Sequence, residues 1–138
     1  MNTFETNDFR NLPVYNKALE IFKVSRAIAC SISDNKNVLE MSLSANFNHQ
    51  FAGEIVSDSL LLAPELAVVH NTSNPLLRLK KAKNIRKAAN RILSQCKKLE
   101  FNGVKEKEFL ILLKSEIHQF DHLFSEWFYK LQLNRKEN

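Results

Sequence analysis

The chain has 138 residues, a length typical of a single domain with one hydrophobic core. Its two glycines and three prolines are too few to reverse the many strands of an all-β domain, so the composition favours helices. Two cysteines exclude a disulfide framework, and the net charge of +5 does not by itself exclude a partner class, because its meaning depends on how it is distributed.

The first segment, residues 1–10, is polar and lacks helical periodicity, which predicts a flexible leader that joins the fold near Asn11. It has neither the positive region nor the apolar stretch of a signal peptide. Further along, no apolar run approaches the ~20 residues that a membrane-spanning helix needs. We therefore expect a cytoplasmic protein that is neither secreted nor embedded in a membrane.

A first amphipathic helix of about five turns is predicted to begin near Pro13. Asn11 is a suitable N-cap, and Pro13 suits the first turn because its missing N–H would have no partner there. The polar run 31–36 is expected to end this helix. The predicted core-facing residues recur at three- and four-residue steps: Val14, Ala18, Ile21, Ser25, Ile28 and Ile32.

The second segment, residues 38–70, has the least regular pattern. Its first part, 38–46, alternates apolar and polar residues, which leaves a short strand open as an alternative to a helix. From Phe47 onward the apolar residues follow one helical face, so we let the longer pattern decide for a helix. Pro64 should kink or break it near residues 61–64, because proline removes a hydrogen bond and clashes with the preceding turn.

Two further helices are predicted over residues 76–100 and 106–132. The polar run 71–75 supplies a start signal for the first of them, and residues 102–103, Asn-Gly, are suited to end it. In each helix, apolar residues alternate at steps of three and four, as in packed bundles. These seam residues are Ala82, Ile85, Ala89, Ile92, Cys96 and Leu99, followed by Leu110, Leu113, Ile117, Phe120, Phe124, Trp127 and Leu131.

Four helices with short connections predict an all-α fold, an antiparallel up-and-down four-helix bundle over residues 11–132 with a basic polar tail at 133–138. Cys30 and Cys96 both fall in apolar helical patterns. We expect both to be buried as small hydrophobic residues, without a redox or metal-binding role.

The positive charge is concentrated in the third predicted helix. Between Leu66 and Leu99 the chain has nine Lys and Arg residues and no Asp or Glu, so the remainder of the chain is net negative. On an ideal helix, five of these cations fall within about 80° of one another, opposite the apolar seam. This basic row consists of Lys80, Lys83, Lys87, Arg91 and Lys98, with Arg78, Arg86 and Lys97 as secondary contact residues.

Two interpretations of the basic row remain open. In the first, it neutralises phosphates of structured RNA or DNA, and binding weakens steeply with added salt. In the second, it is a solvated face balanced by acids such as Glu116, Asp121 and Glu126, and the protein is an interaction scaffold for another protein. We favour nucleic acid because no acid interrupts the nine cations. No exposed aromatic residue is expected beside the row, so base stacking is not predicted.

Neither a catalytic constellation nor a cofactor site is predicted. The chain lacks the Glu-x-x-His pairs of di-iron bundles and the Arg-x(4–6)-His motif of helical RNases, and two glycines cannot build a phosphate-cradling loop. His118 and His122 lie one turn apart with Glu126 in the same row, but ligands converging from several elements are missing. We expect a protein that is not an enzyme and holds no metal.

Both ends of the predicted bundle carry a family resemblance. Residues 9–18, Phe-Arg-Asn-Leu-Pro-Val-Tyr-Asn-Lys-Ala, resemble the opening of the bacterial four-helix bundle proteins first described from intervening sequences in 23S rRNA genes. Residues 115–128 and the basic tail are similar to the last helix of that family and of its relative, the accessory variability determinant of diversity-generating retroelements. Pro64 fits a proline common in the family's second helix. The family's Arg-Arg-Ala-Ala and Asn-Ile-Ala-Glu-Gly segments are absent from residues 38–70.

The resemblance implies a non-enzymatic bundle that assembles into a ring, often a pentamer. In the retroelement branch it also implies binding to a reverse transcriptase and to structured RNA through basic surfaces. We therefore expect a homo-oligomeric, nucleic-acid-binding accessory protein.

Overall fold

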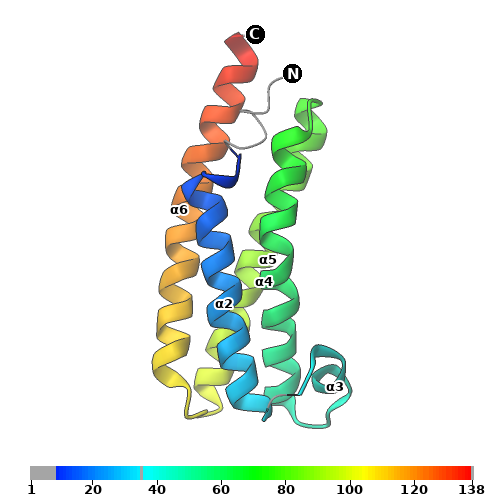
Figure 1. Ribbon diagram of the computed structural model, residues 1–138, viewed down its shortest axis with the longest axis vertical. Helices are drawn as coiled ribbons and strands as arrows, with labels where there is room; N and C mark the ends of the chain where they lie inside the picture. The colour runs from blue at the N-terminus through cyan, green and yellow to red at the C-terminus, as the bar shows by residue number, and fades with distance from the viewer. Residues whose placement is uncertain (1–8, 35, 138) are drawn as a thin grey trace.

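The described part of the chain, residues 9–34 and 36–137 of a computed structural model, folds into helices and connecting loops and contains no strand. Its helices are α2 (Pro13–Ser33), α3 (Val38–Leu43), α4 (Phe47–Asn71), α5 (Pro75–Phe101) and α6 (Lys107–Glu137). The four long helices lie side by side as a bundle, and the short α3 lies beside the start of α4 (Figure 1). Helix α2 packs against α4 and α6, and α5 packs against the same two helices.

Helix α2 begins at the predicted proline, but the predicted cap residue is wrong. Leu12 occupies the N-cap position, and no side chain accepts a hydrogen bond there. At the other end, Asp34 adopts a left-handed φ of 53° and donates its N–H to the carbonyl of Cys30. The helix therefore runs to Ser33, into the segment predicted to be a connection.

The alternative of a strand over residues 38–46 is wrong, because a short helix forms there. The Asn37 side chain accepts the N–H of Glu40 at 2.8 Å, and the Glu40 carboxylate accepts the N–H of Asn37 at 3.2 Å. This capping box starts α3. A second cap at Asn46 then starts α4, so the predicted segment 38–70 consists of two helices.

Helix α4 continues through Pro64, so of the predicted kink or break near residues 61–64 the break does not occur. Proline at this position leaves the carbonyl of Leu60 without its helical N–H partner. Both Pro64 and Leu60 are exposed, so water can satisfy the freed carbonyl and the helix does not need to end.

The buried core confirms the predicted seams. All six predicted seam residues of α5 are buried, as are the first five of α6, while Trp127 and Leu131 pack half-buried against them. The two largest fully buried side chains are Phe120 and Phe124. Four core residues come from α2 and a further set from α4: Val14, Ala18, Ile21 and Ile28, then Ile55, Leu62, Ala63, Leu66 and Val69.

The structure describes part of the predicted leader and most of the predicted tail. Residues 1–8 of the predicted leader and Asn138 lie outside the described residues. Phe9 packs against the core, with its ring centroid 4.7 Å from that of Tyr15 and 5.5 Å from that of His70. Helix α6 runs to Glu137, so residues 133–137 of the predicted tail continue the helix.

Helix α4 also carries apolar side chains on its outer face. Leu60, Leu61 and Val68 are 54%, 47% and 39% exposed. On an ideal helix they lie within about 100° of one another, so they form one apolar surface. Across residues 9–34 and 36–137, no helix combines the length and the apolar character needed to cross a membrane.

Candidate nucleic-acid interface

The start and the buried seam of α5 determine which of its side chains face solvent. Asn74 accepts the N–H of Leu77 at 3.0 Å, and Pro75 occupies the first turn, as the sequence predicted. Since α5 packs between α4 and α6 along its seam, the opposite side of this 27-residue helix is left to solvent.

Half of the eight predicted contact residues are exposed lysines that have no hydrogen bond or ion pair with another described residue. Three of them, Lys80, Lys83 and Lys87, follow one another on the outer face of α5. Lys97 lies near the end of the same helix. Such ammonium groups can meet a phosphate without first losing a protein contact. The four residues are Lys80, Lys83, Lys87 and Lys97.

Arg91 and Lys98 are exposed but already contacted by α4. The Nη2 of Arg91 lies 2.9 Å from Oδ1 of Asp58, and its Nε lies 3.2 Å from both carboxylate oxygens. This hydrogen bonding raises the pKa of Arg91. The ammonium of Lys98 lies 5.2 Å from the centroid of the Phe51 ring. The cation at Arg91 is therefore partly balanced by an acid from α4.

Arg78 and Arg86 turn toward α6 and contribute to packing. Arg78 is only 4% exposed, and it donates to the carbonyl of Thr72 at 2.9 Å and to Oε1 of Gln132 at 3.2 Å. Arg86 is exposed, but its Nη2 donates to Oγ of Ser125 at 2.8 Å and its guanidinium lies 5.3 Å from the Phe124 ring centroid. Arg78 is therefore not part of the exposed row, because burial keeps it from a large external partner.

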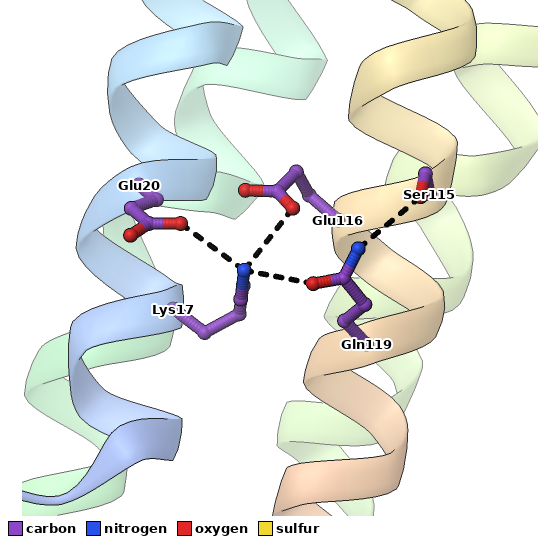
Figure 2. A network of polar contacts seen from close by, with 5 residues as sticks. All are labelled: Lys17, Glu20, Ser115, Glu116 and Gln119. Atoms are coloured by element: carbon purple, nitrogen blue, oxygen red, sulfur yellow. Dashed lines mark hydrogen bonds and ion pairs between the residues drawn. The ribbon is translucent and has the colours of Figure 1, made fainter.

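The three acids expected to balance the basic row lie elsewhere. Glu116 faces α2, where the ammonium of Lys17 donates to Glu116 and Glu20 at 3.1 Å each and to Gln119 at 3.0 Å (Figure 2). Burial disfavours the charged form of Lys17, but the hydrogen bonds to Glu116 and Glu20 outweigh it and raise the pKa of Lys17.

The other two predicted acids lie on α6. Glu126 lies 3.1 Å from Nε2 of His122, and Asp121 is exposed. Within the described residues, none of these three acids forms a direct ion pair with α5. The acid that does pair with the basic row is Asp58, on α4.

The prediction that no aromatic residue is exposed beside the basic row is wrong at the end of α5. Phe101 is 92% exposed and Phe47 is 68% exposed. Both line an open groove of about 440 Å³ together with Lys97 and Lys98. The sequence did contain a signal, because Phe101 follows Lys83 by about five full helical turns and therefore lies on the same face.

His118 and His122, the two histidines one turn apart, are exposed on α6. His122 lies beside Glu126, and His118 lies one turn earlier. Among the residues that the structure describes, no group of three or more His, Cys, Asp and Glu side chains is arranged to hold a metal ion.

The two cysteines differ in accessibility, so the prediction that both are buried is correct for Cys96 and wrong for Cys30. Burial raises the pKa of the Cys96 thiol to about 12, so almost none of it is thiolate at neutral pH.

We expect a thiol-reactive disulfide reagent at pH 7.5 to modify Cys30 in the folded protein and Cys96 only in denaturant. Absorbance of the released thiolate measures this. The variant Cys30→Ser should be unreactive when folded, and rapid labelling of that variant would contradict the burial of Cys96.

No family model, curated protein or solved structure matches this chain.

Proposed function

We propose that this protein is a non-enzymatic, homo-oligomeric accessory protein that binds structured RNA or DNA through the outer face of α5. The observation that carries the proposal is the run of Lys80, Lys83 and Lys87, exposed on one face and without an acidic partner among the described residues. Neutralising phosphates with such a row releases counterions from the nucleic acid, and this release drives binding. The role beside a reverse transcriptase rests on the family resemblance of residues 9–18 and 115–128.

The proposed fold class is an antiparallel up-and-down four-helix bundle. The colour gradient in Figure 1 supports it, since α2 and α5 run down the view while α4 and α6 run up it. Each pair of long helices in contact then joins helices of opposite direction. The connections from α4 to α5 and from α5 to α6 are short, as this topology requires. The connection from α2 to α4 is longer and contains α3.

The apolar outer face of α4 supports self-association. Leu60, Leu61 and Val68 leave apolar surface in water that a second subunit would cover. A pentameric ring is what the family resemblance implies. The same face also favours the alternative function, an interaction scaffold for a different protein.

Reversing two charges in the basic row tests nucleic-acid binding. We expect the wild type to bind a fluorescent RNA hairpin at 50 mM salt, and roughly 100-fold more weakly at 200 mM if four phosphates are contacted. The variant Lys83→Glu/Lys87→Glu should bind at least tenfold more weakly at low salt. The slope of its plot of log affinity against log salt concentration should be smaller in magnitude by about two, because two phosphate contacts are lost. Fluorescence anisotropy measures both quantities.

The matched control reverses the same number of charges on other helices. Lys23 on α2 and Lys130 on α6 are exposed, so Lys23→Glu/Lys130→Glu changes net charge equally. If both double variants lose the same affinity, the row has no special role and only net charge matters. Absence of binding by the wild type at low salt would reject the proposal. Light scattering should give one and the same oligomeric mass for all three proteins.

A further inference from the structure

A cluster of exposed aromatic and basic side chains lies where the end of α5 meets the start of α4. The ring of Phe101 is almost fully exposed, and the exposed Phe47 ring lies against Phe51 with centroids 6.4 Å apart and planes 20° apart. Lys97 and Lys98 line the same open groove. Apolar side chains gathered at one place in water mark an interaction surface more often than single exposed residues do.

Contacts on both sides keep this groove in place. The Asn102 side chain donates to Oδ1 of Asn48 at 2.7 Å and ties the end of α5 to the first turn of α4. The ammonium of Lys98 lies beside the ring of Phe51, which holds the lysine at the groove. Phe101 makes no ring–ring contact with another described residue, so its ring is free to accept a planar ligand.

The chemistry of the groove selects a particular occupant. Its described lining residues include two lysines and no acid, so it complements a negative charge, while the phenylalanine rings offer flat apolar surfaces. An unpaired nucleotide combines both properties, because its base stacks on aromatic rings and its phosphate pairs with lysine. A base inside a duplex is already stacked between its neighbours and cannot do this.

We propose that the groove binds an unpaired base of single-stranded RNA or DNA, stacked on Phe101 and Phe47, with the adjoining phosphates held by Lys97 and Lys98. This inference rests on the proposed function and extends it. Lys87 lies ten residues before Lys97, about 15 Å along the axis of α5, so the basic row continues the phosphate contacts of the groove. The basic row then contacts backbone, and the groove distinguishes a single strand from a duplex.

The variant Phe101→Ala separates stacking from charge. We expect it to bind a labelled 12-nucleotide oligouridylate or oligothymidylate about tenfold or more weakly than the wild type, the usual cost of removing one stacking ring. Affinity for a blunt RNA duplex should change by less than twofold. The salt dependence should stay the same, because stacking releases no counterions. The oligouridylate and oligothymidylate arms show whether the groove prefers RNA or DNA.

A second variant gives a direct signal. Phe101→Trp should retain single-strand binding, and the emission of the new tryptophan should be quenched when a base stacks on it. Phe109 is a matched control, since it is a 56% exposed phenylalanine on α6. Phe109→Ala should bind like the wild type, and Phe109→Trp should add no quenching. Circular dichroism should show unchanged helix content in every variant, because both sites are exposed.

The outcomes separate this inference from the proposed function. If the wild type binds neither single strands nor duplex at low salt, both are rejected. If it binds nucleic acid but Phe101→Ala binds single strands as tightly as the wild type, only the groove assignment is rejected. A fall in oligomeric mass for Phe101→Ala, with oligonucleotide affinity unchanged, would also reject it and assign the groove to a second copy of the chain.

Discussion

Replacing Phe124 with alanine is expected to lower the free energy of unfolding by about 3–5 kcal/mol. The side chain is fully buried, and its ring centroid lies 5.9 Å from that of Phe120, 5.8 Å from Trp127 and 6.0 Å from Phe128. Alanine would leave a cavity between these rings and remove the surface on which the Arg86 guanidinium lies. Urea denaturation followed by circular dichroism measures the change.

The same substitution at Phe109 is the control for this experiment. Because that side chain is 56% exposed, Phe109→Ala should change stability by no more than about 0.5 kcal/mol. A cost below about 1 kcal/mol for Phe124→Ala would show that this part of α6 does not face the core. It would then contradict the seam on which the whole fold depends.

Replacing Glu116 with alanine is expected to cost about 2 kcal/mol, the second largest effect. The side chains of Lys17 and Glu116 are only 15% and 12% exposed, so the variant leaves an ammonium short of its buried partner between α2 and α6 (Figure 2). In the background Lys17→Met the same change should cost at least 1 kcal/mol less, because the interaction is already gone. Chemical denaturation of the four proteins provides this double-mutant cycle.

Glu20→Ala is the matched control within the same network. Glu20 contacts the same ammonium at the same 3.1 Å, but its side chain is 56% exposed, so its removal should cost less than about 1 kcal/mol. Equal costs for Glu20→Ala and Glu116→Ala would contradict the role of burial. Since the pKa of Lys17 is raised in the folded protein, the stabilisation is fully present below its ordinary pKa of 10.5 and is lost as the pH rises above it.

The helical segments and their buried faces could be predicted because they depend on local information. Alternating steps of three and four place Ala82, Ile92 and Leu99 on one side of α5, and the structure buries all three. Asn74 and Pro75 start that helix through a cap that involves only the next few residues. The cap acts within one turn and the seam within one helix, so neither requires knowledge of the neighbouring helices.

Two predictions failed because one structural signal competed with another. Asn46 starts a new helix inside a segment whose apolar pattern had suggested one continuous helix. Pro64 would break an isolated helix, but the packing of Leu62, Ala63 and Leu66 into the core keeps α4 continuous. In both places the outcome depends on the balance between local backbone preferences and burial, which the pattern alone does not measure.

The sequence by itself determined the angle of every cation around the axis of α5, because helical periodicity relates each side chain to its own helix. Only the tertiary structure decided which cations are available to a partner. Arg78 is buried beside Gln132, and Arg91 is paired with Asp58, a residue far away in the sequence. The groove at Phe101 exists for the same reason, since it forms only when the end of α5 packs beside the start of α4. Contacts between helices depend on which surfaces meet, and a single helix's periodicity carries no information about its neighbours.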